Sequence, residues 1–200
     1  MLILVSSTNL PPTMSSPLAP SRVLFYGVTG SGKSSAALAY AEATGLPAFF
    51  VDDSIGWLPG WEQRGAAEQR GLGAAIAVEN QWVLDGAYGG WRDLVMARAE
   101  LVVALDFPRW LSLCRLIRRT VRRIVTSQVV CNGNRETVAR LFSKDSVVRW
   151  HFQSFARKRR IIRDMEAEPS PPRVVVFRRP KDLETWLAGV ATAASRAKSL

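Results

Sequence analysis

Residues 27–34 read Gly27-Val28-Thr29-Gly30-Ser31-Gly32-Lys33-Ser34, a glycine-rich run that ends in a lysine and a hydroxyl side chain. An apolar run over residues 23–26 precedes it, and a helix-forming run over residues 35–41 follows it. Such a run between a buried strand and a helix is typical of a phosphate-binding loop. The alternative is a glycine- and serine-rich turn with an incidental lysine, which needs neither flanking element. We therefore expect the chain to bind a nucleoside triphosphate.

Each residue type of this loop has a physical role. Glycine permits the backbone conformations that turn successive amide groups inward, so that they form a nest for phosphate oxygens at the positive end of a helix. Lys33 adds a mobile charge for the β- and γ-phosphates, and the Ser34 hydroxyl is the expected ligand of Mg²⁺. ATP and Mg²⁺ are the predicted cofactors, with loop contacts from Gly27, Thr29, Gly30, Ser31, Gly32, Lys33, Ser34 and Ser35.

The length of 200 residues favours a single α/β domain with a sizeable core, which could carry a small mobile subdomain. Cys114 and Cys131 stand far apart and are accompanied by one histidine, so neither a disulfide framework nor a zinc site is indicated. That histidine, His151, has no catalytic partner in view and is assigned no role. Thiols of this kind are typical of a reducing cytosol, and we expect a cytoplasmic protein.

The first residues lack the features of a secretory signal. Met1–Val5 is apolar, but no basic segment precedes it, and serine, threonine and proline dominate up to Ser21. No later segment approaches the length of a membrane span. We expect residues 1–21 to form a disordered extension, and we expect no membrane partner.

The formal net charge of +10 is spread unevenly. Residues 115–163 are crowded with arginine and lysine, and only Glu136 and Asp145 oppose them. A field of this sign attracts polyanions. Nucleotide phosphates and nucleic acid both qualify, so the charge alone does not choose between them.

Short apolar runs alternate with helix-forming segments along the chain. Strands are expected at about 22–26, 48–51, 81–84, 101–105 and 173–177, and the helices between them at about 33–43, 62–79 and 182–194. The pattern predicts a three-layer α/β/α fold with a five-stranded parallel sheet. Ligands bind beyond the carboxyl ends of such strands. Four side chains should therefore gather at one edge: Lys33, Asp53, Asp85 and Asp106.

A long helical region separates the fourth and fifth strands. Apolar and arginine residues recur at helical spacing from Trp110, the run Asn132-Gly133-Asn134 predicts a turn, and a second amphipathic helix is expected from near Arg135. We interpret the hairpin around this turn as a small helical lid over about 119–135, within one domain spanning 22–195.

These features together resemble a known family. The order of phosphate loop, Asp85-Gly86, Asp106, arginine-flanked lid and late β–α unit is similar to that of the nucleoside-monophosphate kinases, with adenylate kinase as their type. More narrowly, residues 53–61, 82–88 and 105–111 resemble adenylate-kinase-like proteins called FlaR-type DNA topology modulation proteins. The resemblance covers about residues 22–190.

The resemblance implies a P-loop NTPase fold and a kinase that transfers the γ-phosphoryl of Mg-ATP to a nucleotide or another small acceptor. Phosphoryl transfer needs positioning and charge stabilisation more than covalent chemistry. By this resemblance Asp85 orients the hydrated Mg²⁺, and Lys33 acts with lid arginines that close over the phosphates. Those arginines are Arg115, Arg118, Arg119, Arg122 and Arg123, of which Arg119 and Arg123 are predicted to be catalytic and Arg115 and Arg119 to bind the nucleotide.

The acceptor side departs from the family pattern. The type enzyme carries an arginine for the acceptor's phosphate where this chain has Gly89, and Arg92 is the nearest substitute. The segment after the second strand offers Asp53, Trp57 and Trp61 instead. An acidic group beside aromatic rings can hydrogen-bond and stack a base or another ring, so the acceptor need not be AMP.

Several interpretations stay open on sequence alone. Asp106 is either a Mg²⁺-directed carboxylate or an N-cap of the helix that opens near Pro108. Trp57 and Trp61 either pack in the core or form a wall of the acceptor site. An ATP-dependent regulatory or DNA-binding protein is the second functional hypothesis, although no nucleic-acid-binding motif is visible and the kinase is favoured.

Overall fold

The structure is a computed structural model that describes residues 20–168 and 171–198. The expected N-terminal extension therefore lies outside the described residues, except for its last two positions. None of the helices in the described part of the chain combines the length and the apolarity needed to span a bilayer.

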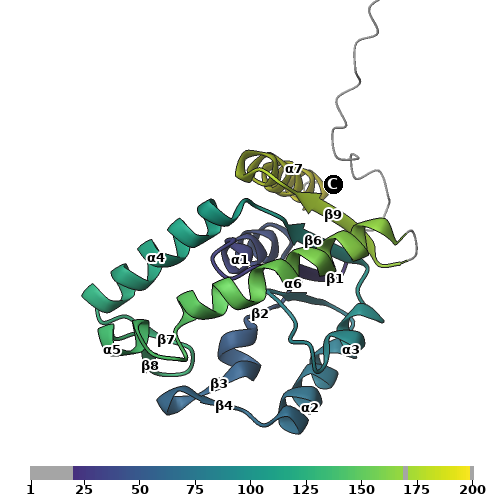
Figure 1. Cartoon of the computed structure of the whole chain (residues 1–200). Coiled ribbons are helices and arrows are strands. Elements are labelled where there is room, and N and C mark those ends of the chain that lie inside the picture. The colour runs from purple at the N-terminus through teal and green to yellow at the C-terminus, as the bar shows by residue number, and fades with distance from the viewer. Residues whose placement is uncertain (1–19, 169–170, 199–200) are drawn as a thin grey trace, which may run out of the picture.

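A five-stranded parallel sheet forms the centre of the molecule (Figure 1). Its order is β2-β5-β1-β6-β9. The strands are β1 (Arg22–Gly27), β2 (Ala48–Phe49), β5 (Trp82–Leu84), β6 (Leu101–Leu105) and β9 (Arg173–Phe177). The predicted parallel sheet is confirmed. β1 lies centrally because it is a continuous apolar run with buried neighbours on both sides.

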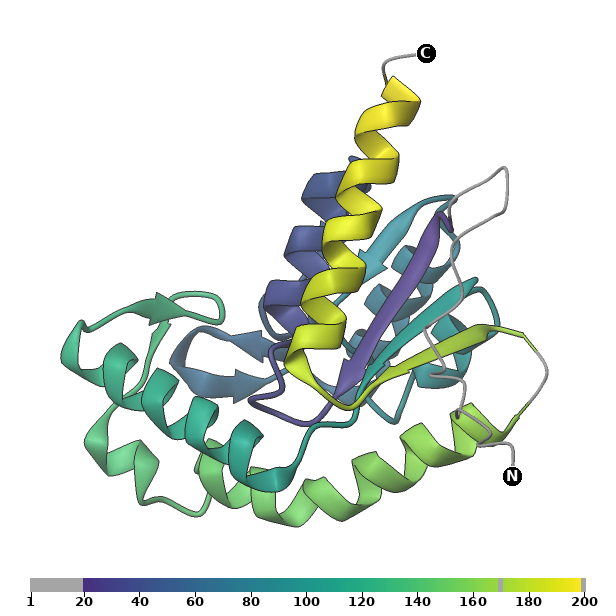
Figure 2. The same ribbon diagram turned by 90° about the horizontal axis from the view of Figure 1, so that it is seen from above.

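Helices cover both faces of the sheet and complete the predicted three layers (Figure 2). On one face, α1 (Lys33–Thr44) and α7 (Pro180–Lys198) pack on Val23, Phe25 and their neighbours. On the other face, the strand residues that alternate with these, such as Leu24 and Tyr26, pack against three helices: α2 (Ala66–Ala77), α3 (Arg92–Met96) and α6 (Val147–Ala167). Each fully buried Leu, Val or Phe side chain of these layers contributes roughly 1.5 to 3 kcal/mol.

The segment after β2 differs from the expected short strand and long helix. It contains a π-helical turn, η1 (Asp52–Gly56), and a small hairpin of β3 (Trp57–Leu58) and β4 (Glu62–Gln63) joined by the 3₁₀ turn η2 (Pro59–Trp61). Gly60 lies in the left-handed region with φ 80°, which lets the chain reverse there. The helix predicted from residue 62 therefore begins only at Ala66, and α3 was not predicted.

The region between β6 and β9 also differs in detail. After α4 (Arg109–Val125) comes a hairpin of β7 (Val129–Val130) and β8 (Asn134–Arg135), followed by the single turn α5 (Val138–Leu141). The amphipathic helix expected from Arg135 is α6, which begins at Val147. Ser146 caps it by accepting a hydrogen bond from the Val148 amide at 3.3 Å. The apolar spacing alone did not reveal this cap.

An ion pair attaches α6 to the end of β6. Asp106 is 4 % exposed, and its two oxygens accept from Arg159 Nε at 2.5 Å and Nη2 at 3.0 Å. α4 begins at Arg109 with Pro108 as its N-cap residue and no side-chain cap, so Asp106 does not cap the helix. Removing the cation from a buried, paired carboxylate of this kind strongly destabilises the folded state.

We expect Arg159→Ala to lower the free energy of unfolding by about 3 kcal/mol, because the Asp106 carboxylate would stay buried without a partner. The matched control is Arg160→Ala, which removes an exposed arginine one position along and should cost less than about 0.5 kcal/mol. Urea denaturation followed by circular dichroism measures both. Equal effects of the two substitutions would contradict the structural role of the pair.

Candidate phosphate-binding site

The glycine-rich run forms the turn between β1 and α1, as its composition predicts. Gly30 and Gly32 have φ angles of 84° and 92°, a region that side-chain-bearing residues rarely adopt. A Cβ atom on Gly30 would lie 2.3 Å from the Ser112 carbonyl oxygen of α4. The turn thus needs glycine both for its backbone angle and for its contact with α4.

Two side chains from distant helices hold the outer side of this loop. Arg115 of α4 donates from Nη1 to the Ser31 carbonyl oxygen at 3.3 Å. His151 of α6 is fully buried, and its Nδ1 donates to the Thr29 carbonyl oxygen at 3.0 Å. The structure therefore gives His151 a part in the site that the sequence had not assigned, and a lone histidine offered no signal for it.

Lys33, Ser34 and Asp85 come together at the carboxyl ends of the strands, as expected. Ser34 Oγ donates to Asp85 Oδ2 at 2.5 Å, and Asp85 Oδ1 accepts from the Val51 amide at 2.8 Å. Asp85 is only 5 % exposed. The Lys33 side chain passes Gly86 closely, since a Cβ there would lie 3.5 Å from Lys33 Cε.

The residues present fit a magnesium nucleotide. Ser31 Oγ, in the loop, is buried without a hydrogen-bond partner, as is Arg119 Nε on α4 within electrostatic reach of Asp52. The Ser34 hydroxyl and the Asp85 carboxylate supply the hard oxygen atoms that Mg²⁺ prefers. Gly30 leaves room for α4 to pack on the loop, and a Cβ on Gly32 would lie 3.7 Å from the Arg115 guanidinium.

Lysine and arginine side chains from α4 and α6 add positive charge at this end. Burial, and then the charge of Arg123, lowers the pKa of Arg119. Burial, and then the charge of Lys33, lowers the pKa of Lys158 to about 8, while Asp52 opposes that shift. Lys158 was not among the predicted site residues, because the sequence places it in the basic run over residues 157–160.

The helical phase of α6 separates that basic run into different environments. Arg157 lies over the Trp150 ring at 5.5 Å, Arg159 binds Asp106, and Arg160 is exposed. Lys158 is half-buried and lies within electrostatic reach of Lys33 in the phosphate loop. A run that looks uniform in sequence thus has a member within electrostatic reach of the loop.

A group of carboxylates lies on the side of the site where the acceptor was expected. Burial, followed by the charges of Asp52 and Asp85, raises the pKa of Asp53, while a hydrogen bond from the Cys131 backbone and the charge of Arg123 lower it. Asp52 Oδ1 accepts from Tyr88 Oη at 2.6 Å. Asp53 therefore lies within electrostatic reach of both Asp85 and the lid residue Arg123.

Trp57 and Trp61 belong to neither core cluster and join the β3–β4 hairpin to the lid. Their rings meet edge to face with centroids 5.6 Å apart, and the Arg140 guanidinium lies 4.2 Å from the Trp61 centroid. Asn134 accepts from the Trp61 amide at 2.6 Å and donates to the Leu58 carbonyl oxygen at 2.9 Å. The lid hairpin is thereby bonded to the acceptor-side segment.

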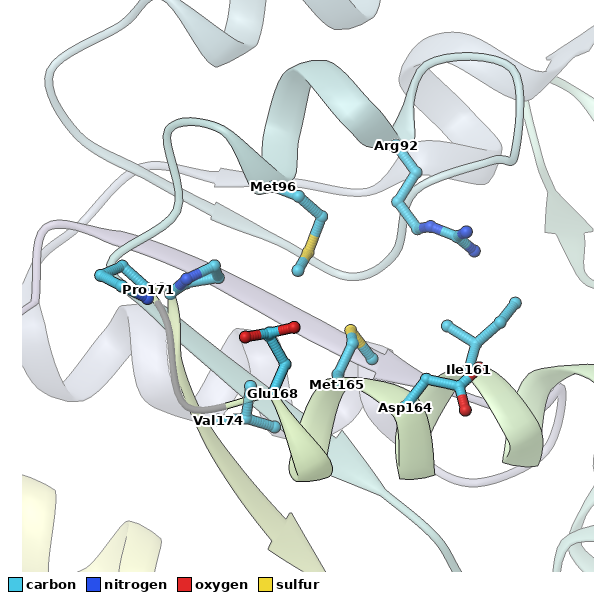
Figure 3. A pocket seen from close by; sticks show the side chains of 9 residues that line it. Arg92, Met96, Ile161, Asp164, Met165, Glu168, Pro171 and Val174 are labelled. Atoms are coloured by element: carbon cyan, nitrogen blue, oxygen red, sulfur yellow. The ribbon is translucent and has the colours of Figure 1, made fainter.

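Arg92 and Asp106 have other partners than Ser34 and Asp85. Arg92 donates to Tyr26 Oη at 3.3 Å and lines a pocket of about 380 Å³, none of whose lining residues belongs to the phosphate loop (Figure 3). A Cβ on Gly89 would meet nothing within 4 Å. Asp106 was predicted either as a metal ligand or as a helix N-cap; Arg159 engages both of its oxygens, and its role as a metal ligand stays a prediction.

Comparisons with known proteins agree with this architecture. Neither a scan against protein-family models nor a search of the curated proteins gives a match. Among solved structures, a gluconokinase from Sinorhizobium meliloti 1021 is 20 % identical with a TM-score of 0.50, over 90 % of this chain and 96 % of that chain. This chain shares with that protein the fold of a five-stranded parallel sheet with flanking helices. A shikimate kinase from Bacteroides thetaiotaomicron is 16 % identical with a TM-score of 0.51, over 91 % of this chain and 100 % of that chain.

The buried histidine predicts a pH dependence of stability. Burial is the largest cause that lowers the pKa of His151, and the charges of Arg109 and Lys158 act in the same direction, against the Thr29 hydrogen bond. The unfolded chain therefore takes up this proton more readily than the folded chain. The stabilisation is complete above the unfolded pKa of about 6.5 and is lost as the pH falls below it.

We expect the free energy of unfolding to decrease between about pH 7 and pH 5, and to decrease less steeply in His151→Asn, which keeps a donor for the Thr29 carbonyl oxygen but does not titrate. Urea denaturation at several pH values measures the two slopes. Carboxylates that titrate in the same range affect both proteins alike. Parallel profiles would show that His151 is not kept neutral by its surroundings.

Proposed function

We propose that this protein is a kinase that transfers the γ-phosphoryl group of Mg-ATP to a nucleotide or another small hydroxylated acceptor. The observation that carries the proposal is the Ser34–Asp85 hydrogen bond of 2.5 Å beside the glycine loop and Lys33. A protein that only binds a triphosphate needs the loop, whereas phosphoryl transfer also needs oxygen atoms poised for a metal and cations for the transferred group.

The donor half of the site follows from the loop. The backbone amides of residues 27–34 and the start of α1 bind the phosphates, with Lys33 on the β- and γ-phosphates. Mg²⁺, when bound, would neutralise charge between those phosphates, and Ser34 and Asp85 would hold it. In the free protein Arg119 is repelled by the charge of Arg123, and Lys158 by the charge of Lys33. Both side chains gain an anionic partner when the nucleotide binds.

The lid is proposed to extend over about 119–135 and to keep water away from the transferred group. Its hairpin contacts the β3–β4 segment through Asn134, and the end of α4 brings Arg123 within electrostatic reach of Asp53. Water competes with the acceptor for the phosphoryl group, so a closed lid favours transfer over hydrolysis.

The proposed step is an in-line displacement. A hydroxyl oxygen of the acceptor bonds to the γ-phosphorus, the bond from that phosphorus to the bridging oxygen breaks, and ADP leaves with the electron pair. The hydroxyl proton passes to the Asp53 carboxylate, whose raised pKa suits it to accept a proton. Trp57 and Trp61 are proposed to limit the site on the lid side, and Arg92 is kept as a more remote candidate for the acceptor's charge.

The acceptor class draws support from two observations. Gly89 stands where the resembling family has its phosphate-gripping arginine, so AMP would lack that contact. The two solved relatives are named as a gluconokinase and a shikimate kinase, which are kinases of small molecules. We therefore rank small hydroxylated metabolites beside nucleotides. The narrower resemblance to FlaR-type proteins stays a prediction, since no comparison bears on it.

The test is ATP consumption by the purified protein with a panel of nucleoside monophosphates, nucleosides and small hydroxylated metabolites. We expect one acceptor class to stimulate turnover, and Lys33→Ala to reduce it at least about 100-fold, because the β- and γ-phosphates lose their lysine. Asp53→Asn should reduce transfer while leaving ATP affinity within about twofold, because it lies on the acceptor side. If no acceptor stimulates turnover and duplex DNA binds with a steep salt dependence, the regulatory hypothesis replaces the kinase.

The pKa of Lys158 predicts how ATP affinity depends on pH. Below about pH 8 the ammonium is charged and attracts the phosphates, and above that pH the charge is lost. We expect ATP affinity to fall several-fold, up to about tenfold, between about pH 7.5 and pH 9. Lys158→Arg, which stays charged, should bind with little pH dependence, and Lys158→Met should bind weakly throughout. Calorimetric titration measures all three, and an unchanged profile in Lys158→Met would remove Lys158 from the site.

A further inference from the structure

The outer face of α4 carries an apolar stripe that the rest of the described chain does not cover. Four large side chains lie on it at spacings of seven, four and four residues, and their exposed fractions are 67 % for Trp110, 43 % for Ile117, 46 % for Val121 and 77 % for Val125. The exposed Cys114 lies within the same stripe. We call these five residues the α4 stripe. Such spacing places all of them on one side of the helix.

The opposite side of α4 already has its partners. Ser112, Leu116 and Thr120 are buried, and the Ser112 carbonyl and Leu116 lie against Gly30 of the phosphate loop. α4 runs along the edge of the molecule in Figure 1, with α6 on its inner side. The α4 stripe therefore belongs to neither core cluster and takes no part in the contact of α4 with Gly30.

Positive charge borders the stripe. Arg118 and Arg122 are exposed on the side of α4 next to the apolar residues, and α4 contains no acidic residue over its 17 positions. Within the described residues, neither arginine forms an ion pair. An exposed helix with large apolar side chains on one side and unpaired arginines beside them has the composition of a helix that lies in a membrane interface.

We propose that the α4 stripe, with Arg118 and Arg122, docks on the surface of an anionic phospholipid bilayer. The apolar side chains would enter the boundary between headgroups and acyl chains, and the two arginines would bind lipid phosphates. At a rise of 1.5 Å per residue, α4 is roughly 25 Å long, so it presents this stripe over several helical turns.

Two other occupants fit the surface less well. A nucleic acid would satisfy the arginines but would leave an aliphatic stripe without apolar contacts. A second copy docking through the same face would bring two helices without acidic residues together, and like charges would oppose each other. The proposal departs from the expectation of no membrane partner, which rested on the lack of a spanning segment.

The experiment is co-sedimentation of the full-length protein with vesicles of phosphatidylcholine alone and of phosphatidylcholine with phosphatidylglycerol. We expect binding to the anionic vesicles that weakens with salt, and at least tenfold weaker binding to the neutral ones. Val125→Glu should weaken the binding about tenfold or more, because it places a carboxylate in the stripe. Val78→Glu is the matched control, since Val78 is 65 % exposed at the end of α2, and it should bind like the wild type.

A second pair of variants separates local charge from overall charge. Arg118→Gln/Arg122→Gln should lose at least tenfold in vesicle binding, whereas Arg160→Gln/Arg163→Gln removes the same charge from α6 and should lose far less. Thermal unfolding verifies that each variant is folded. The proposal is overturned if the protein ignores anionic vesicles or if Val125→Glu binds them like Val78→Glu. It is also overturned if Val125→Glu abolishes duplex DNA binding or a lipid-independent dimer while vesicle binding persists.

Discussion

The end of this molecule that carries the glycine-rich loop depends on the close approach of that loop to α4. Gly30 adopts a left-handed backbone angle against the Ser112 carbonyl, at a distance that leaves no room for a side chain. The turn that directs amide groups inward leaves the Thr29 and Ser31 carbonyl groups facing outward into packed surroundings. Buried carbonyl groups need donors. His151 and Arg115 supply them, so the loop, α4 and α6 form one unit.

α6 carries two of the titratable side chains whose pKa is lowered by burial near the loop. His151 and Lys158 lie seven residues apart, two helical turns, and burial lowers the pKa of both. Arg159 turns the other way and is paired with Asp106. A protein that keeps Lys158 within electrostatic reach of Lys33, with Asp52 opposing their repulsion only in part, is poised for an anion, because a bound phosphate would offset the remaining repulsion. The same helix therefore stabilises the sheet through one residue and prepares the site through its neighbour.

Much of the fold and part of the site could be predicted because they follow from short runs of apolar residues and from the order of the strands. The strands β6 and β9 lie where their apolar runs begin and end, and Ser34 meets Asp85 because parallel strands end at one edge. The short helix α3 (Arg92–Met96) was missed, and the other errors fall between residues 50 and 65 and between 126 and 146. There the chain is held by contacts such as Asn134 with Leu58, 76 residues apart. Periodicity within a short window cannot reveal such partners.

The sequence by itself determined that a phosphate loop joins a buried strand to a helix, and that its lysine, serine and nearby aspartate share one edge of a parallel sheet. These follow from residue type and order, since glycine angles and strand direction are local properties. Only the tertiary structure decided which of the many basic residues serve the site. Lys158, Arg159 and Arg160 are neighbours in sequence, yet one approaches Lys33, one binds Asp106 and one is exposed. The different surroundings of these three residues follow from the rotation of α6 about its axis, which is set by how the whole helix packs and not by any single residue.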